Sequence, residues 1–261
     1  KEVPRDHHEA RRHADAPLFW EAMLSEWESQ TECRTFMPVP ADDPALADVI
    51  VIPLGWVFDI KVNTLTNALI KYKARLIARG NHSLPDIHFY ETYSGVVRMS
   101  TVRLLLALAA ANSWELTSAD VPTAYLQSWL HDVVVYCSWP PGFEHFQPGT
   151  VLRCHRSLYG LPQSAHEWGT ELREALLEFG FKRCWSDRQL YVWNTPRGIL
   201  LVCCWVDDLL CATSSSEMRR EFMAFMQRFR ITDLGPLRRG LGADIYQDLD
   251  AGTVTFSLTG Y

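Results

Sequence analysis

The stretch ILLVCCWVDDLLCAT, residues 199–213, decides the fold. One apolar run reaches Asp207 and Asp208, and a second apolar run leaves them. A surface hairpin normally carries polar residues on one face of each strand, so this pattern predicts two buried strands with the acids at their tip. Adjacent carboxylates repel each other, so a divalent cation is their natural partner. The alternative is an ordinary Asp-Asp turn, because aspartate tolerates turn backbone angles.

Two further blocks hold polar residues at the ends of predicted elements. In SADVPTAYLQ, residues 118–127, Asp120 ends a strand-like segment five residues before Tyr125. Taken alone, an aspartate in that position is typical of a cap or a turn. In SLYGLPQSAHEW, residues 157–168, the chain bends just before a helix and leaves Gln163 near its start. The alternative there is an ordinary loop-to-helix junction with a capping glutamine.

Composition indicates a globular protein. The 261 residues are 48% hydrophobic and 21% charged and include 10 Trp, which excludes a disordered chain. The longest apolar runs, 104–111 and 199–206, are too short to cross a bilayer, which takes about 20 residues. The polar N-terminus KEVPRDHHEARRHADAP does not fit a secretory signal, and we expect an intracellular protein. Seven cysteines without a CxxC pair predict reduced thiols and no structural zinc.

A basic segment offsets the net charge of −6, which by itself argues mildly against a nucleic-acid partner. No acid lies between Asp59 and Asp86. The positive charges in this interval are Lys61, Lys71, Lys73, Arg75 and Arg79. In a strand, alternate residues share a face, so one face of this segment is predicted to be basic and to meet phosphates.

Local patterns predict an α+β domain around an antiparallel sheet. Helices are expected at 15–29, at 100–111 with Ser100 or Thr101 as the cap, at 164–179 and at 216–229. Strands are expected at 56–61, 71–78, 115–120, 133–136, 151–155, 189–193, within 198–213, and at 241–246 and 253–258.

Blocks along almost the whole chain follow one order and spacing. They are FWEAMLSEWES, GWVFDIK, KYKARLIARGN, ETYSGVVRMSTVRLLLALAA, SADVPTAYLQ, VYCSWPPGFE, SLYGLPQSAHEW, FGFKRCWSDRQLYV, LLVCCWVDDLLCAT and ITDLGPLRRGLGADI. In this order they resemble the reverse transcriptase of copia-type LTR retrotransposons, the Pseudoviridae. So many specific blocks in one order are not expected by chance.

The resemblance implies a right-hand polymerase fold with an antiparallel palm sheet, packed helices and β-rich fingers. A thumb is expected to be largely absent, because the chain ends at Tyr261, where a thumb would begin. The implied segments are an N-terminal helix and connection at 1–55, fingers at 56–112, palm at 113–130, fingers at 131–160, and palm with a primer-grip-like hairpin at 161–261.

The resemblance also implies the chemistry. Asp120, Asp207 and Asp208 would be catalytic and would hold two Mg²⁺ ions, with Mn²⁺ as a possible substitute. One ion would lower the pKa of the primer 3′-hydroxyl and the other would steady the dNTP triphosphate, on an RNA or a DNA template. The chain would then be an RNA-directed DNA polymerase, a nucleotidyltransferase.

Nucleotide contacts follow from the same resemblance. Tyr125 would lie under the incoming sugar and exclude ribose, which disfavours an RNA-dependent RNA polymerase. The alternative interpretation is that Tyr125 is a core tyrosine of the palm. Gln163 would lie beside the sugar. Lys73 and Arg75 would meet the triphosphate, and the sequence does not decide which of the two touches it. Their alternative is a solvated basic face.

Nucleic-acid contacts are expected from Lys71 and Arg79, to template or primer phosphates, and from Trp205, near the primer end. Trp205 stands where the family has tyrosine, and Arg-Arg-Gly at 238–240 replaces Lys-Tyr-Phe in the primer-holding block. A catalytically silent or decayed copy that only binds nucleic acid is therefore the alternative function. A ribonuclease H and an integrase are expected elsewhere in a longer Pol polyprotein, which would work in cytoplasmic virus-like particles and in the nucleus, without a membrane partner.

Overall fold

The computed structural model describes residues 2–62, 69–83, 92, 94–131 and 133–258. Residues 91 and 93, in the ETYSGVV block, lie outside this part of the chain. The chain divides into two compact units, each made of two segments. Unit 1 comprises Lys1–Tyr93 and Tyr125–Glu167, and unit 2 comprises Ser94–Ala124 and Trp168–Tyr261.

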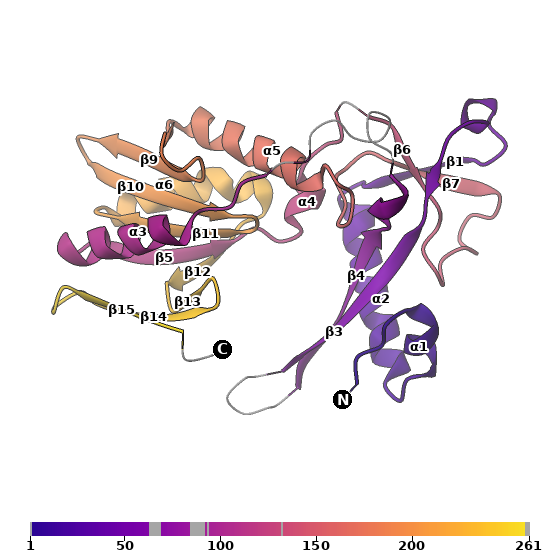
Figure 1. The fold of residues 1–261 in the computed structure, drawn as a ribbon, viewed down its shortest axis with the longest axis horizontal. Helices are drawn as coiled ribbons and strands as arrows, with labels where there is room; N and C mark the ends of the chain where they lie inside the picture. The colour runs from indigo at the N-terminus through magenta and orange to yellow at the C-terminus, as the bar shows by residue number, and fades with distance from the viewer. Residues whose placement is uncertain (1, 63–68, 84–91, 93, 132, 259–261) are drawn as a thin grey trace. The chain divides into compact units, whose positions relative to one another are not determined.

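Unit 1 combines two N-terminal helices with short sheets (Figure 1). Its helices are α1 (His7–Arg12), α2 (Ala16–Glu32) and the 3-10 turns η1 (Pro44–Leu46) and η2 (Gly80–His82). Its strands are β1 (Phe36–Pro40), β2 (Val51–Ile52), β3 (Leu54–Val62), β4 (Leu69–Ala78), β6 (Val135–Cys137) and β7 (Thr150–Cys154). The division between the units falls inside α4 (Ala124–Gln127) and α5 (Ser164–Phe179).

The β3–β4 hairpin has the two faces that its alternation predicts. The strands pair antiparallel, with Trp56 opposite Leu76. Apolar side chains of both strands are buried against α2, where Phe19 meets Tyr72 edge-on at 4.9 Å between ring centroids. The opposite face keeps the basic side chains partly or fully exposed. Helix α2 follows Asp15, close to the predicted start, and Asp15 Oδ2 accepts a hydrogen bond from Tyr72 Oη at 2.7 Å.

The other sheet of unit 1 has the strand order β1-β7-β6-β2. β6 and β7 pair antiparallel, which confirms the hairpin predicted over 133–155. β2 joins β6 in parallel, a pairing that the sequence did not predict because it joins segments more than 80 residues apart.

Unit 2 contains a six-stranded sheet and a separate three-stranded sheet, in the order β13-β14-β15. Its helices are α3 (Met99–Ala111), α6 (Ser216–Met226) and the 3-10 turn η3 (Gln227–Phe229). Its strands are β5 (Glu115–Asp120), β8 (Lys182–Arg183), β9 (Leu190–Thr195), β10 (Gly198–Trp205), β11 (Asp208–Thr213), β12 (Thr232–Pro236), β13 (Arg239–Gly240), β14 (Ala243–Asp248) and β15 (Thr253–Ser257).

The six-stranded sheet is antiparallel throughout, in the order β12-β5-β11-β10-β9-β8. Leu201 and Cys203 of β10 belong to the core that α3 covers, so the alternate residues Leu200 and Val202 point to the other face, where α6 contacts β10. All four side chains are buried. Because both faces are covered (Figure 1), the strands carry the continuous apolar run seen in the sequence.

The start of α3 depends on a contact that local sequence patterns do not show. The predicted cap of α3 at Ser100 or Thr101 was wrong, because the helix begins at Met99 after the N-cap Arg98. Thr101 Oγ1 instead donates to Asp187 Oδ2 at 2.6 Å, and Arg98 N donates to the same oxygen at 2.9 Å. An aspartate 86 residues away in the chain therefore fixes the start of α3.

Within the described ranges, no helix combines the length and the apolar character needed to cross a membrane.

Candidate functional site

Three aspartates lie at one end of two neighbouring strands in unit 2. Asp120 ends β5 and Asp208 begins β11, and the two are paired α-carbon to α-carbon. Asp207 lies in the two-residue turn that joins β10 to β11, since Trp205 pairs with Asp208. Strand β12 pairs with β5 on its other side, so Asp120 lies at the end of a strand that has a neighbour on both sides. The two strands pair although 87 positions separate Asp120 from Asp207 in the sequence.

The backbone of this turn is held from two sides. Trp168 Nε1 of α5 donates to the carbonyl oxygen of Val206 at 2.7 Å. The backbone N of Val121, which follows Asp120, donates to the carbonyl oxygen of Asp207 at 2.9 Å. Val206 has φ 55°, a conformation that a β-branched residue rarely adopts. These two hydrogen bonds hold the turn backbone on both sides of Asp207.

The electrostatics of the three carboxylates favour a cation. Burial raises the pKa of Asp208, and the neighbouring Asp207 and Asp120 raise it further. The acids are therefore close enough to repel one another, and their donor atoms are all oxygen, the ligand type of hard ions such as Mg²⁺. As the side chains stand, no group of three or more His, Cys, Asp or Glu in the described part of the chain is arranged to hold a metal ion.

In unit 1, an aromatic and cationic cluster includes two of the predicted nucleotide-binding residues. Tyr125 of α4 packs against Tyr159 with ring centroids 4.7 Å apart. The guanidinium of Arg75 lies over the ring of Tyr159, 4.6 Å from its centroid. Tyr159 thus connects Arg75 of β4 to Tyr125. Its place in the SLYGLPQ block was the only signal in the sequence, and its contacts could not be derived from it.

A close approach of two backbones fixes Tyr159. Its carbonyl oxygen accepts a hydrogen bond from Ala78 N at 2.7 Å. Gly160 has φ +90°, and a Cβ there would lie only 2.0 Å from the carbonyl oxygen of Ala78. Only glycine fits such a contact, so Gly160 sets the position of Tyr159 against the end of β4.

The other two predicted nucleotide-binding residues lie near this cluster in sequence. Lys73 shares a face of β4 with Arg75, and burial, with Arg75 and Lys61 nearby, lowers its pKa. Gln163 is 2% exposed and directly precedes α5, where its carbonyl oxygen accepts from Glu167 N at 3.0 Å. Arg75 therefore contacts Tyr159, which in turn contacts Tyr125, whereas Lys73 lies two residues earlier on the same face of β4.

The residues predicted to contact nucleic acid belong to different elements. Lys71 is exposed and lies opposite Lys61 across the β3–β4 hairpin, which concentrates positive charge there. Arg79 lines a groove of about 370 Å³ in unit 1. The cationic and imidazole side chains of this groove are Arg5, His7, His8 and Arg79. In unit 2, Trp205 is half-buried and packs against the core under α3.

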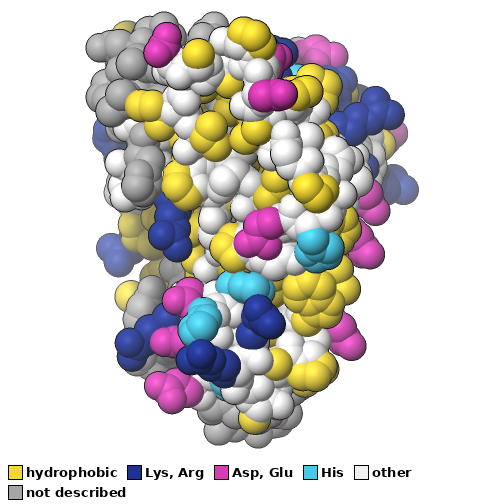
Figure 2. Space-filling model, turned by 90° about the vertical axis from the view of Figure 1, so that its right-hand side faces the viewer, with side chains coloured by type: hydrophobic (Ala, Val, Ile, Leu, Met, Phe, Trp, Pro, Cys, Tyr) yellow, Lys and Arg dark blue, Asp and Glu magenta, His cyan; other side chains and the backbone are white. Residues whose placement is uncertain are grey.

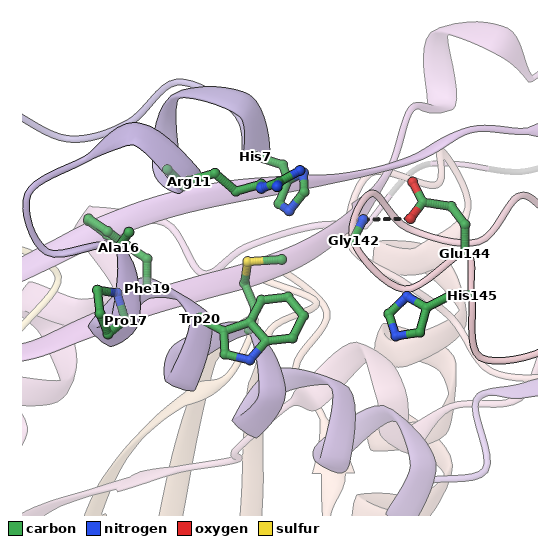
Figure 3. Close-up of a pocket in the computed structure, with 11 residues that line it drawn as sticks. His7, Arg11, Ala16, Pro17, Phe19, Trp20, Gly142, Glu144 and His145 are labelled. Carbon is green, nitrogen blue, oxygen red and sulfur yellow. Dashed lines mark hydrogen bonds between the residues drawn. The ribbon is translucent and has the colours of Figure 1, made fainter.

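A larger cavity, of about 590 Å³, lies in unit 1 and contains none of the residues predicted from the sequence. Figure 3 shows Arg11 and His7 on one wall, Trp20 below them, and Glu144 and His145 on the facing loop. Arg11 and Glu144 carry opposite charges, and burial together with Arg11 lowers the pKa of His7. Figure 2 shows His, Lys and Arg side chains mixed with acidic ones on one face of the molecule. The charges around this cavity select neither anions nor cations.

A family model described as "Reverse transcriptase (RNA-dependent DNA polymerase)" matches residues 42–261. The chain belongs to the reverse transcriptase family. The predicted resemblance is confirmed; membership of this family implies a right-hand polymerase fold, and the chain is a mixture of helices and several sheets.

Similar proteins support this membership. The chain is 34% identical over 226 residues to the retrovirus-related Pol polyprotein from transposon RE2 of Arabidopsis thaliana, covering 86% of the chain and 15% of that protein. The polyprotein from transposon RE1 of the same plant is also 34% identical, over 85% of the chain and 15% of its own length. The polyprotein from transposon TNT 1-94 of Nicotiana tabacum is 27% identical over 94% of the chain and 18% of its length. This reverse transcriptase domain thus spans about 15% of the length of the first two polyproteins.

Proposed function

We propose that this chain is the polymerase domain of a retrotransposon reverse transcriptase, which joins a dNTP to a primer 3′-hydroxyl on an RNA or DNA template. The observation that carries the proposal is the pairing of Asp120 with Asp208 beside Asp207, within a chain of the reverse transcriptase family. In this proposal the six-stranded sheet of unit 2 is the palm, and the β3–β4 hairpin belongs to the fingers.

The three carboxylates would hold divalent cations. Asp120, Asp207 and Asp208 offer only oxygen ligands at one strand end, and the burial and neighbouring negative charges that raise the pKa of Asp208 support a cation site there. Bound Mg²⁺, or Mn²⁺ in its place, would lower the pKa of the 3′-hydroxyl and neutralise the triphosphate. The protein supplies the orientation of the carboxylates, through the strand pairing and the two hydrogen bonds to the turn.

The cluster in unit 1 would bind the incoming nucleotide. Tyr125 would contact the sugar and reject ribose, and Gln163 would lie beside that sugar. Arg75 and Lys73 would neutralise charge that develops on the leaving pyrophosphate. Arg75 contacts Tyr159, which itself contacts Tyr125. This link supports a joint role for Arg75 and Tyr125 in binding the nucleotide.

The template and the primer would be held largely through phosphates. Lys71 and Arg79 supply exposed positive charge, and such contacts do not depend on base sequence. Trp205 would approach the primer end. The remainder of a Pol polyprotein, with ribonuclease H and integrase, would complete the element's cycle, and cytoplasmic particles and the nucleus are the proposed locations.

Primer extension tests this function. The purified chain, a labelled primer on RNA or DNA template, dNTP and Mg²⁺ should give extended product. Asp207→Asn should give none, because it removes a carboxylate from the site. Asp250→Asn is the matched control, since Asp250 is exposed in the turn between β14 and β15. Equal extension by the two variants would contradict the proposal.

A catalytically silent copy is the second candidate. It is favoured by Trp205, which stands where the family has a smaller tyrosine, and by the altered 238–240 block. Template-primer binding by the wild-type chain without any extension, on either template and with either Mg²⁺ or Mn²⁺, would establish this second function.

A further inference from the structure

The turn that carries Asp207 depends on a contact from outside the hairpin. Val206 and Asp207 form the whole turn between β10 and β11, and Val206 holds a positive φ of 55°. This backbone conformation is unfavourable for a β-branched residue and persists only when neighbouring groups fix it. Some interaction must therefore hold the Val206 peptide in place.

Trp168 provides that interaction. Its indole N–H, which can only donate, reaches the carbonyl oxygen of Val206 at 2.7 Å. The side chain is 2% exposed and meets the ring of Phe229 edge-on at 5.4 Å, so its orientation is fixed by packing. A buried, well-oriented donor is suited to holding a strained peptide, because the alternative is an unpaired buried indole N–H.

Repulsion among the carboxylates opposes the arrangement that a shared cation needs. Among the residues that the structure describes, the side chains of Asp120, Asp207 and Asp208 are not arranged as a metal site. A cation can draw flexible side chains together, but the backbone that carries them must already be correctly placed. Val121 N holds the Asp207 carbonyl from the β5 side, and Trp168 holds the Val206 carbonyl from the α5 side.

We infer that Trp168 is a positioning residue for the cation site: its N–H to Val206 holds the turn so that Asp207 can share a divalent cation with Asp120 and Asp208. The inference rests on the proposed function. Groups that orient metal ligands from behind typically contribute about 10–100-fold to metal affinity, so loss of this N–H should weaken cation binding by at least about tenfold.

The test measures Mn²⁺ binding by the whole 261-residue chain without nucleic acid. The electron paramagnetic resonance signal of free Mn²⁺ reports how much of the ion remains unbound. Trp168→Phe keeps an aromatic ring against Phe229 and removes the donor. Trp56→Phe is the matched control: Trp56 is 4% exposed and donates to the Pro141 carbonyl at 3.0 Å, in unit 1. Melting curves of both variants measure the general cost of losing a buried indole hydrogen bond.

The expected result is an Mn²⁺ dissociation constant raised at least about tenfold in Trp168→Phe and unchanged in Trp56→Phe, with comparable falls in melting temperature. The Mg²⁺ concentration for half-maximal primer extension should rise in parallel. Equal Mn²⁺ affinity in Trp168→Phe and wild type, or an equal loss in both variants, would overturn the positioning role.

Two further variants distinguish a failure of the cation site from a failure of the role of Trp168. Asp207→Asn should lose Mn²⁺ binding; if it binds as wild type does, the cation site itself is wrong and the inference fails with it. If Asp207→Asn loses Mn²⁺ and Trp168→Phe retains it, only the role of Trp168 fails. Should Trp168→Phe not fold, 3-benzothienylalanine at position 168 replaces the N–H by sulfur at nearly constant shape, and the same two outcomes decide.

Discussion

Asp208 lies directly opposite Asp120 in the register of β11 and β5, so two carboxylates share one end of a largely buried sheet. Burial and the charges of Asp207 and Asp120 together raise the pKa of Asp208. The folded chain thus holds negative charges in an arrangement that costs stability unless a cation is present. The charge of Asp208 thus differs in its effect from that of a carboxylate that stabilises the fold.

Asp208→Asn should abolish primer extension while leaving the metal-free chain at least as stable as wild type. The substitution keeps the shape of the side chain and removes a charge that its neighbours repel. The measurement is the melting temperature at neutral pH in EDTA, together with primer extension in Mg²⁺. A clearly lower melting temperature would mean that Asp208 is a structural acid.

Asp187 should behave in the opposite way. Burial alone would raise its pKa, but hydrogen bonds from Thr101 Oγ1, Arg98 N and Gln189 N outweigh this and lower the pKa below its ordinary value of 3.8. Hydrogen bonds to a charged group contribute about 1.5–3 kcal/mol each, so Asp187→Asn should cost roughly 1–3 kcal/mol of unfolding free energy at pH 7. A lowered pKa means that this stabilisation is present above pH 3.8 and is lost as the pH falls through the folded value.

Urea unfolding from pH 7 to pH 3 measures this difference. The gap between wild type and Asp187→Asn should stay constant down to about pH 5 and narrow below about pH 4. Thr101→Ser, which keeps the hydroxyl, is the control and should remain close to wild type. A gap that is independent of pH throughout would show that the carboxylate charge is not what fixes the start of α3.

Tyr125 is expected to act on sugar choice by shape. Tyr125→Ala or Tyr125→Val should raise the efficiency of rNTP relative to dNTP by about tenfold or more, which corresponds to at least about 1.4 kcal/mol of relieved clash. Tyr125→Phe keeps the ring and should keep the discrimination. Steady-state primer extension with matched dNTP and rNTP gives the ratio. A core tyrosine would instead lower both efficiencies equally, with about 3 kcal/mol of lost stability.

Gly160 should tolerate no side chain. Gly160→Ala would place Cβ against the Ala78 carbonyl oxygen at 2.0 Å and should cost more than about 3 kcal/mol. Gly149→Ala is the matched control: it also has a positive φ, of +75°, but meets no atom within 4 Å, so it should cost only about 1–2 kcal/mol. Urea unfolding compares the two. Similar costs would mean that the close approach of 160 to β4 is relaxed in solution.

The sequence by itself predicted the longer helices and most of the longer strands, but not α1, β1, β2 or β12. The apolar run around Asp207 and Asp208 required strands covered on both faces, and alternation along β4 separated a buried face from a basic one. These inferences succeed because side-chain period and burial are local properties of a strand. The prediction of the α3 cap was wrong because the start of this helix is fixed by a residue distant in the sequence. The acceptor, Asp187, lies 86 residues from Thr101.

Only the tertiary structure decided how distant residues meet. The register that sets Asp120 opposite Asp208 depends on a pairing between strands almost 90 residues apart, and sequence periodicity fixes a strand's faces but not its partner. The link from Arg75 through Tyr159 to Tyr125 joins three separate segments. The hydrogen bond from Trp168 to Val206 likewise joins a helix to a turn 38 residues away. Such contacts arise from packing and from pairing buried polar groups, which act between neighbours in space and leave no periodic trace in the sequence.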